Sequence, residues 1–450
     1  MTDYDVIVIG AGLGGLSAAA LCQHRGLKTV VFENSGNVGG CCSSYTENGY
    51  TFDTGASIVE LNFVMDELFM KIGRKTLDYI PFQPIDPIYG FLTEDGQKFS
   101  YPVSPEETRK VIEQFNPADG KNWDAFCKVG AEAIEEAFGK VMTKPMMTFT
   151  AATKIFLENP KMAKVAPVMV KNFEQVLTSS FENEKVRASM SLQSYFLGLP
   201  PALCPGYVAY LAYSEHMGIF YPKGGMIGIP NGMLKAFKED GGTLQLKTKV
   251  DKILTEGKKV IGVKLADGTE VRSKIVVSDI NARVVYEQLI GEAKLPLWAN
   301  WAIKSYPYSI PAPMVCLGLD AKPDLSCHHT FCYTTLDEMN NIWFRDYENH
   351  KLPLGGFMLI SWPSHADPSM APKGHHSLNL VTFAPYHLAD GDWDDEEYKE
   401  RYLEATLDTM EKKFHLNLRK HITVKRLIDP KTFERRFLHP QGAVYGLMND

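Results

Sequence analysis

The sequence predicts an α/β protein, and three observations near its start lead to this prediction. Residues 6–9 form a continuous apolar run, which is typical of a strand buried on both faces of a parallel sheet. Gly10, Gly12 and Gly15 follow in G-x-G-x-x-G spacing, and the segment from 13 to 25 is an Ala-rich helix candidate. A second predicted strand, from 27 to 32, leads into the acidic residue Glu33. Together they predict a Rossmann-like dinucleotide-binding domain.

Each part of this motif has a physical role in binding a dinucleotide. Gly10 allows a tight turn, Gly12 lets the backbone approach a pyrophosphate, and Gly15 lets the helix pack closely on the strand. The start of the helix offers unpaired N–H groups and a positive dipole end to the phosphates. Glu33 lies 18 residues after Gly15, where a carboxylate accepts a hydrogen bond from a ribose 2′-hydroxyl. An acid there disfavours a 2′-phosphate, so the ligand is expected to be FAD or NAD.

Composition narrows the classes of protein to which the chain can belong. Its 450 residues exceed one ordinary core, so two or more structural units are expected. A net charge of -7 gives no reason to expect a nucleic-acid partner. Eight cysteines at irregular spacings predict reduced thiols and a cytoplasmic location. The uncharged residues 6–22 are interrupted by glycines and preceded by acids, so they predict neither a signal peptide nor a membrane span.

The segment after Glu33 favours FAD over NAD. The Gly39-Gly40 pair permits a second close approach of the backbone to the cofactor. Phe52-Asp53-x-Gly55 is expected to be a short strand that turns into another cofactor-facing loop. A plain NAD-binding unit has no use for these two segments, whereas FAD in its extended form reaches further along the protein.

Several segments of the sequence resemble one flavoprotein superfamily. They are G-A-G-L-G-G-L at 10–16, the strand-ending Glu33, N-V-G-G at 37–40 and F-D-T-G-A-S at 52–57. The same resemblance extends to Y-P-K-G-G-M-I-G-I-P at 221–230, D-P-S-M-A-P at 367–372 and D-P-K-T-F-E at 429–434. The superfamily contains phytoene desaturases, carotenoid isomerases and retinol saturases, and amine oxidases resemble the chain more distantly.

The resemblance implies a discontinuous FAD-binding domain with an inserted α+β substrate domain. The FAD-binding domain is expected at 1–85, 221–295 and 426–450, and the substrate domain at 86–220 and 296–425. The predicted cofactor-binding residues are Gly10, Gly12, Leu13, Gly14, Gly15, Glu33, Asn34, Gly39, Gly40, Cys41, Asp53, Gly55, Ala56, Ser57, Val250 and Ser278. Superfamily members usually close with a glycine-rich turn that reaches the flavin, and the sequence ends at Asp450 before such a motif. The expectation is either a shortened chain or an FAD domain that closes differently.

The rest of the chain is predicted element by element. Acids and apolar residues at helical spacing predict a helix over 105–138, and strand-like runs occupy 88–92, 244–254, 259–265 and 270–277. Later, strands are expected at 314–319 and 377–383, and an acidic helix at 394–414.

Two segments bear on the substrate. Residues 141–171 carry five lysines against one glutamate in a Met- and Phe-rich setting. They are either a peripheral membrane-surface patch through which an apolar substrate enters, or a solvated helix face over a Met-packed core. Residues 188–214 contain no charge, and three prolines prevent one spanning helix. They are expected to be partly core and partly the lining of an apolar substrate cavity.

The resemblance implies an FAD-dependent oxidoreductase or redox-dependent isomerase that acts on carbon–carbon bonds of a carotenoid, isoprenoid or similar apolar substrate. Hydride would pass between an allylic carbon and flavin N5, and the sequence singles out no catalytic acid or base. With one dinucleotide site, electrons are expected to reach or leave the protein through a diffusing quinone, oxygen or NAD(P)H. The alternatives are a flavin oxidase of amines or other small molecules, and a flavin- or lipid-binding protein without turnover.

Two cysteine-containing clusters have weaker functional interpretations. Cys41-Cys42 could act in redox chemistry, although buried packing is the simpler explanation. Cys327, His328, His329 and Cys332 match no common zinc spacing, so no metal is predicted.

Overall fold

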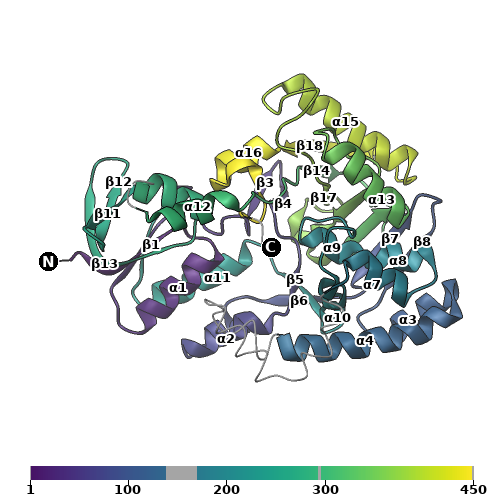
Figure 1. Cartoon of the computed structure of the whole chain (residues 1–450), viewed down its shortest axis with the longest axis horizontal. Coiled ribbons are helices and arrows are strands. Elements are labelled where there is room, and N and C mark those ends of the chain that lie inside the picture. Colours follow the sequence, from purple (N-terminus) through teal and green to yellow (C-terminus); the bar gives the residue numbers. More distant parts are fainter. Residues whose placement is uncertain (1, 138–169, 292–294, 448–450) are drawn as a thin grey trace.

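The computed structural model describes residues 2–137, 170–291 and 295–447 and places two large β-sheets at opposite ends of the long axis (Figure 1). One sheet has six strands and contains the start of the chain. The other has seven strands and comes mainly from the second half of the sequence. The α/β fold class predicted from the sequence is confirmed.

The six-stranded sheet has the order β10-β2-β1-β13-β12-β11. β1 lies inside the sheet and pairs in parallel with β2 on one side and β13 on the other, so that Ile9 faces Phe32 and Ser278. The carboxyl ends of these three strands therefore meet at one edge. The strands are β1 (Tyr4–Ile9), β2 (Thr29–Phe32), β10 (Thr243–Gln245), β11 (Val250–Glu256), β12 (Lys259–Leu265) and β13 (Glu270–Ser278).

Helices α1 (Leu13–His24) and α11 (Gly228–Glu239) pack against each other beside this sheet (Figure 1). The buried residues of α1 are Gly15, Leu16, Ala19 and Ala20. The π-helix η5 (Val284–Gly291) and helix α12 (Leu297–Ser305) follow β13.

The seven-stranded sheet has the order β18-β14-β17-β16-β15-β7-β8. It is antiparallel except where β15 pairs in parallel with β7, which lies more than 200 residues earlier in the chain. The strands are β7 (Tyr89–Thr93), β8 (Lys98–Tyr101), β14 (Met314–Leu319), β15 (His329–Tyr333), β16 (Phe357–Ser361), β17 (His376–Val381) and β18 (Ile422–Ile428).

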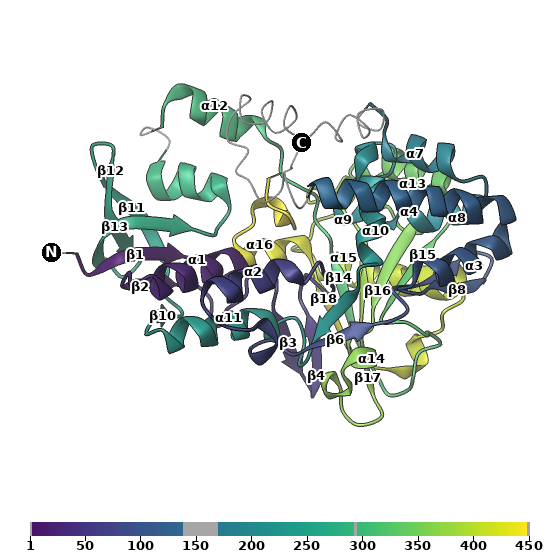
Figure 2. The ribbon, with the colours of Figure 1, turned by 90° about the horizontal axis from the view of Figure 1, so that it is seen from below.

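Helices cover both faces of the seven-stranded sheet (Figure 2). On one face, α15 (Glu396–Lys412) buries Tyr402, Leu407 and Met410 against apolar residues of β14, β16 and β17. On the other, a larger core joins the sheet to helices from 105–137 and 173–215. These helices are α3 (Pro105–Phe115), α4 (Pro117–Ala137), α7 (Phe173–Ser180), α8 (Glu184–Met190), α9 (Leu192–Phe196), η4 (Gly206–Leu211) and α10 (Ala212–Glu215).

Smaller elements connect the two sheets. A three-stranded sheet contains β5 (Val59–Glu60), β9 (Ile219–Pro222) and β6 (Phe82–Ile85), and a hairpin is formed by β3 (Ser44–Glu47) and β4 (Tyr50–Asp53). The remaining helical segments are α2 (Phe63–Lys71), η1 (Thr76–Asp78), α13 (Leu336–Ile342), η7 (Trp343–Tyr347), α14 (Pro363–Ala366), η8 (Pro368–Met370), η9 (Arg419–His421), α16 (Pro430–Phe437) and η10 (Pro440–Gly442).

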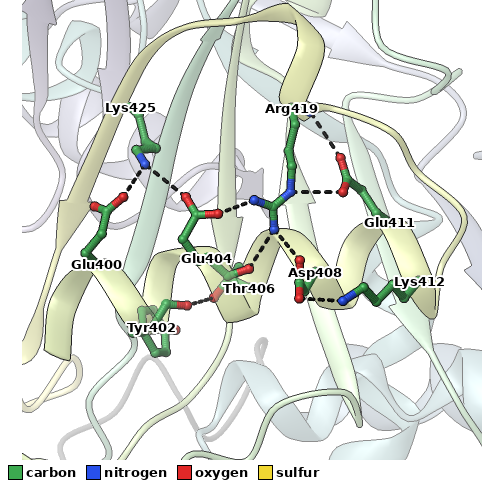
Figure 3. Close-up of polar contacts among 9 residues, drawn as sticks. All are labelled: Glu400, Tyr402, Glu404, Thr406, Asp408, Glu411, Lys412, Arg419 and Lys425. Atoms are coloured by element: carbon green, nitrogen blue, oxygen red, sulfur yellow. Dashed lines mark hydrogen bonds and ion pairs between the residues drawn. The ribbon is translucent and has the colours of Figure 1, made fainter. Parts of the chain in front are cut away.

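An ionic network fastens α15 to the chain that follows it (Figure 3). The Arg419 guanidinium pairs with Glu404, Asp408 and Glu411 from successive turns of α15, with 2.9 Å between Arg419 Nε and Glu411 Oε2. Lys425 on β18 also pairs with Glu404, at 3.1 Å. Because the planar guanidinium pairs with several carboxylates at once, it fixes the position of Arg419 relative to α15.

Two predicted elements differ from the structure. The single strand expected over 244–254 is two strands, because Lys247 adopts a φ of +53° and residues 247 and 248 donate their N–H groups to Ser35 and Glu33 at the end of β2. The helix expected over 105–138 breaks before Pro117, where Asn116 is extended, as a residue preceding proline tends to be.

Other predictions remain open. The domain boundaries stay predictions, as does the membrane-facing part of the predicted substrate domain. Residues 138–169, which include most of the lysine-rich segment, lie outside the described residues. Within 2–137, 170–291 and 295–447, none of the helices combines the length and apolar character needed to cross a bilayer.

Candidate cofactor and substrate site

The glycine-rich turn lies between the carboxyl end of β1 and the start of α1. Gly10 has a φ of +95°, and its N–H donates to the Phe32 carbonyl at 2.9 Å, which ties the turn to β2. A Cβ built on Gly15 would lie 2.2 Å from the Gly10 carbonyl oxygen, so only glycine fits there. The close helix–strand packing expected of the third glycine is thus present.

A cavity of about 990 Å³ begins at this turn and continues to the seven-stranded sheet. Its size is at the upper end for small-molecule sites, which are roughly 300–1,000 Å³. The structure brings most of the predicted cofactor residues together in its wall. These are Gly10, Gly12, Leu13, Gly14, Glu33, Asn34, Gly39, Gly40, Cys41, Gly55, Ala56, Ser57 and Val250.

Three predicted cofactor residues do not line this cavity. Gly15 packs against the turn, and Ser278 lies at the end of β13. Asp53 is buried, where it accepts hydrogen bonds from Tyr221 Oη at 2.6 Å and the Met226 N–H at 2.8 Å. Burial raises the pKa of Asp53, while these hydrogen bonds lower it. The contacts give Asp53 the role of joining β4 to the 221–226 turn, and direct cofactor contact by these three residues stays a prediction.

Glu33 organises the turn as well as facing the cavity. Its Oε2 accepts the Ala11 N–H at 2.8 Å, and its Oε1 accepts the Ser35 N–H at 2.7 Å. Both oxygens are therefore fixed at the end of β2. A carboxylate has further lone pairs, so a ribose hydroxyl can still donate to it.

The far part of the cavity is apolar and aromatic. The uncharged segment supplies part of this wall, and the Tyr195 ring stacks on Phe357 with 4.0 Å between centroids. Such a wall favours a long apolar ligand, because burial of apolar surface drives its binding. The apolar lining residues include Leu192, Tyr195, Phe196, Ala312, Met314, Phe357, Leu359, Val381 and Phe383.

A buried pair of carboxyl groups is a feature that the sequence did not reveal. Glu60 lines the cavity, and Glu215 is buried nearby. Ser214 Oγ donates to Glu60 Oε2 at 3.1 Å, and Gln193 Nε2 donates to Glu215 Oε1. Burial raises the pKa of both carboxyl groups, and the Glu60 charge raises the pKa of Glu215 further. The two glutamates are 155 residues apart in the sequence, and no sequence pattern indicates that they lie close together.

Asp279 and Arg436 also line the cavity, and the sequence did not single them out. Their opposite charges shift the pKa of the Cys41 thiol in opposite directions. Burial raises the pKa of Cys41 to about 12, the Asp279 charge also raises it, and the Arg436 charge lowers it. Burial likewise raises the pKa of Cys42 to about 12. Protonated thiols are poor nucleophiles, which favours the packing interpretation of this cysteine pair.

The two histidines of the possible metal cluster contact the cavity wall instead. His329 Nε2 lies 2.9 Å from Ser57 Oγ, and His328 Nε2 lies 3.3 Å from the Ser57 carbonyl oxygen. Burial lowers the pKa of His328 to about 4, so the ring is neutral at neutral pH. In the described part of the chain, no group of three His, Cys, Asp or Glu side chains is arranged to hold a metal ion.

The residues at the turn fit FAD. A Cβ on Gly12 would come within 2.3 Å of an Asp279 carboxylate oxygen, so only glycine fits there, and the turn itself presents backbone rather than side chains to a phosphate. α1 begins with no acidic residue in its first turn and no side-chain cap, so no side chain of the helix itself occupies the N–H groups at its start. With Glu33 at the predicted ribose position and an apolar continuation, the cavity suits a dinucleotide that carries a flavin.

Comparison with known proteins agrees with this geometry. The chain is 29% identical over 451 aligned residues to the 4,4′-diapophytoene desaturase (4,4′-diapolycopene-forming) of Methylomonas sp., covering 98% of this chain and 85% of that protein. It is 26% identical to the phytoene desaturase (lycopene-forming) of Pseudescherichia vulneris, covering 98% and 88% respectively. The resemblance inferred from the sequence motifs is therefore confirmed.

Solved structures share the fold at low sequence identity. A putrescine oxidase bound to putrescine superposes with a TM-score of 0.60 and 14% identity, covering 95% of this chain and 84% of that one. An oxidoreductase from Methanosarcina mazei gives a TM-score of 0.59 and 17% identity, covering 94% and 88%. The profile of the family described as flavin containing amine oxidoreductase matches residues 13–430. The predictions of an FAD cofactor and an oxidoreductase are confirmed, and the chain belongs to the flavin-containing amine oxidoreductase family.

Proposed function

We propose that this chain uses FAD to add, remove or shuttle hydrogen at carbon–carbon bonds of a carotenoid or another long isoprenoid chain. The observation that best supports this function is one continuous cavity that begins at the glycine-rich turn and ends between aromatic residues. The names of the two desaturases to which the chain is similar support the substrate class.

The residues of the chain have separable tasks in this function. FAD, when bound, supplies hydride transfer. The N–H groups at the start of α1 hold its phosphates, and Glu33 holds a ribose hydroxyl. The aromatic wall around Tyr195 and Phe357 orients the polyene and excludes water from it.

We also propose where the substrate and electrons come from. A long isoprenoid is held in lipid, so the lysine-rich residues 141–171 would bring a cytoplasmic protein to an anionic membrane surface. A diffusing quinone, oxygen or NAD(P)H would complete the electron balance.

The test is a single-turnover reaction with the protein loaded with FAD. Anaerobic incubation with phytoene or 4,4′-diapophytoene in liposomes should bleach the flavin absorbance and yield a product with a longer conjugated chain. A redox-neutral isomerisation instead leaves the flavin oxidised and changes the geometry of a polyene. Neither change with any isoprenoid tested, in protein that retains FAD, would reject the substrate class.

A cavity-filling variant tests whether the substrate uses the apolar part. Ala312→Leu adds bulk to the wall without removing a polar contact, and Ala389→Leu makes the same change on an exposed loop. We expect Ala312→Leu to lower kcat/KM about tenfold or more while FAD binding persists. Equal activity of the two variants would place the substrate elsewhere.

One observation favours amine oxidation as a second candidate. The Glu60 carboxyl in the cavity wall could pair with a substrate ammonium group, and the family description names amines. Flavin bleaching by a diamine such as putrescine, with none by the isoprenoids, would select this alternative.

A further inference from the structure

We propose that Asp279 competes with the FAD pyrophosphate for the N–H groups of the glycine-rich turn, and thereby sets the affinity of the chain for FAD. This inference rests on the proposed function, because it assumes that FAD binds at this turn. It concerns the regulation of that site, and the sequence pattern did not point to it.

The position of the Asp279 carboxylate carries the proposal. A Cβ built on Gly12 would lie 2.3 Å from Asp279 Oδ2, and one built on Gly14 would lie 2.5 Å from Oδ1. The carboxylate therefore lies directly on the glycine surface at the start of α1. The backbone N–H groups of Gly15 and Gly12, which this motif offers to a pyrophosphate, lie close enough to the carboxylate to lower its pKa.

The backbone holds Asp279 in place from the neighbouring strand. Its N–H donates to the Ile9 carbonyl at 2.9 Å, at the point where β13 runs beside β1. α1 supplies no anion of its own, because its N-cap is Gly12 and its first turn has no acidic residue. Asp279 thus places a carboxylate at the positive end of this helix.

The charges around Asp279 determine how it responds to an incoming phosphate. Partial desolvation at the cavity wall raises the pKa of Asp279, the charge of Glu33 after β2 raises it further, and the N–H groups of Gly15 and Gly12 lower it. Cys41 also lies within reach of its charge, and Arg436 acts on Cys41 with the opposite sign. The Asp279 carboxylate occupies the glycine surface that a pyrophosphate must approach, and like charges repel there.

Protonation should weaken this competition. As the pH falls toward the raised pKa, Asp279 loses its charge and becomes a poorer ligand for the N–H groups. FAD affinity should therefore rise as the pH falls, provided Asp279 is present. Asp279→Asn removes the charge at all pH values and keeps the side-chain size.

The experiment measures the Kd for FAD by quenching of flavin fluorescence on titration with the whole chain, at pH 8 and pH 5.5. We expect Asp279→Asn to lower the Kd about fivefold to tenfold at pH 8, and the difference between wild type and variant to be smaller at pH 5.5. Asp267→Asn, in the exposed turn between β12 and β13, is the matched control and should leave the Kd unchanged. Inorganic pyrophosphate, added as a competitor, should displace FAD from Asp279→Asn at lower concentration than inorganic phosphate does.

The outcomes separate this inference from the proposed function. FAD binding that is equal in both proteins, or weaker in Asp279→Asn, overturns the inference and leaves the proposed function intact. If neither protein binds FAD, both the inference and the proposed function are overturned. If only Asp279→Asn binds FAD, the inference is supported. If Asp279→Asn fails to fold, as judged by circular dichroism, Asp279→Ser with the same two pH values replaces it.

Discussion

Glu33 has a structural task in the turn, and we propose that it also binds the ribose of FAD. Its two oxygens already accept the N–H groups of Ala11 and Ser35, which hold the turn against β2. We expect Glu33→Ala to weaken FAD binding at least tenfold, because the ribose loses its charged acceptor and the turn loses its anchor. Isothermal titration with FAD measures the loss, and Glu33→Gln, which keeps an oxygen acceptor, should fall in between. An unchanged Kd in Glu33→Ala would remove the ribose role.

Glu215 and Glu60 make the stability of the protein depend on pH. The pKa of Glu215 in the folded protein lies well above its ordinary value of 4.5, chiefly because of burial and next because of the Glu60 charge. Between those two pKa values the folded state binds more protons than the unfolded state. The free energy of unfolding therefore falls as pH rises above about 4.5, by up to about 1.4 kcal/mol per pH unit for one group.

Glu215→Gln tests this dependence, because glutamine keeps the oxygen that accepts from Gln193 and cannot ionise. We expect the variant to be more stable than the wild type at pH 8 by about 1–3 kcal/mol, and no more stable at pH 4.5. Urea unfolding at both pH values provides the measurement, with Glu256→Gln at the exposed end of β11 as the control. Parallel pH profiles of wild type and Glu215→Gln would show that the pair does not hold an extra proton.

At the scale of elements, the contact of α1 with β1 depends on the absence of a side chain at Gly15. A methyl group there would meet the Gly10 carbonyl oxygen at 2.2 Å, and Gly10 is held in place because its N–H donates to the Phe32 carbonyl of β2. We expect Gly15→Ala to lower the free energy of unfolding by roughly 2–4 kcal/mol. Gly36→Ala, whose Cβ would meet only Lys247 Cε at 3.5 Å, should stay within about 0.5 kcal/mol. Equal effects in thermal unfolding would mean that α1 can shift away from the sheet.

For the whole molecule, the sequence best predicted the elements that depend only on residues adjacent in the chain. The strand, turn and helix from Tyr4 to His24 follow one another directly, so apolar runs and glycine spacing were enough to predict them. The pairing of β15 with β7 and the meeting of Glu60 with Glu215 join segments far apart in the chain. No local pattern contains such contacts, because tertiary packing alone creates them. Asp279 is a similar case, since an acid after a strand has no distinctive spacing.

The position of the cavity makes the two large sheets a single binding unit. Its wall contains Gly12 and Glu33 beside the first sheet, and Met314 and Leu359 from the second. A ligand that touches both must stabilise both, and FAD at about 100 times its Kd adds about 2.7 kcal/mol to the free energy of unfolding. We therefore expect FAD to slow hydrogen exchange in β1 and β2, and an isoprenoid added afterwards to slow it in β14 and β16.

The turn between β11 and β12, around Gly257, serves as the internal reference for exchange, since it lies outside the cavity wall. Protection by FAD confined to the first sheet, followed by protection of the second by the isoprenoid, would assign the two parts of the cavity to cofactor and substrate. Protection of both sheets by FAD alone would mean that the flavin itself reaches the aromatic wall. An isoprenoid that protects neither sheet would contradict the assignment of the apolar part, even if FAD binds as expected.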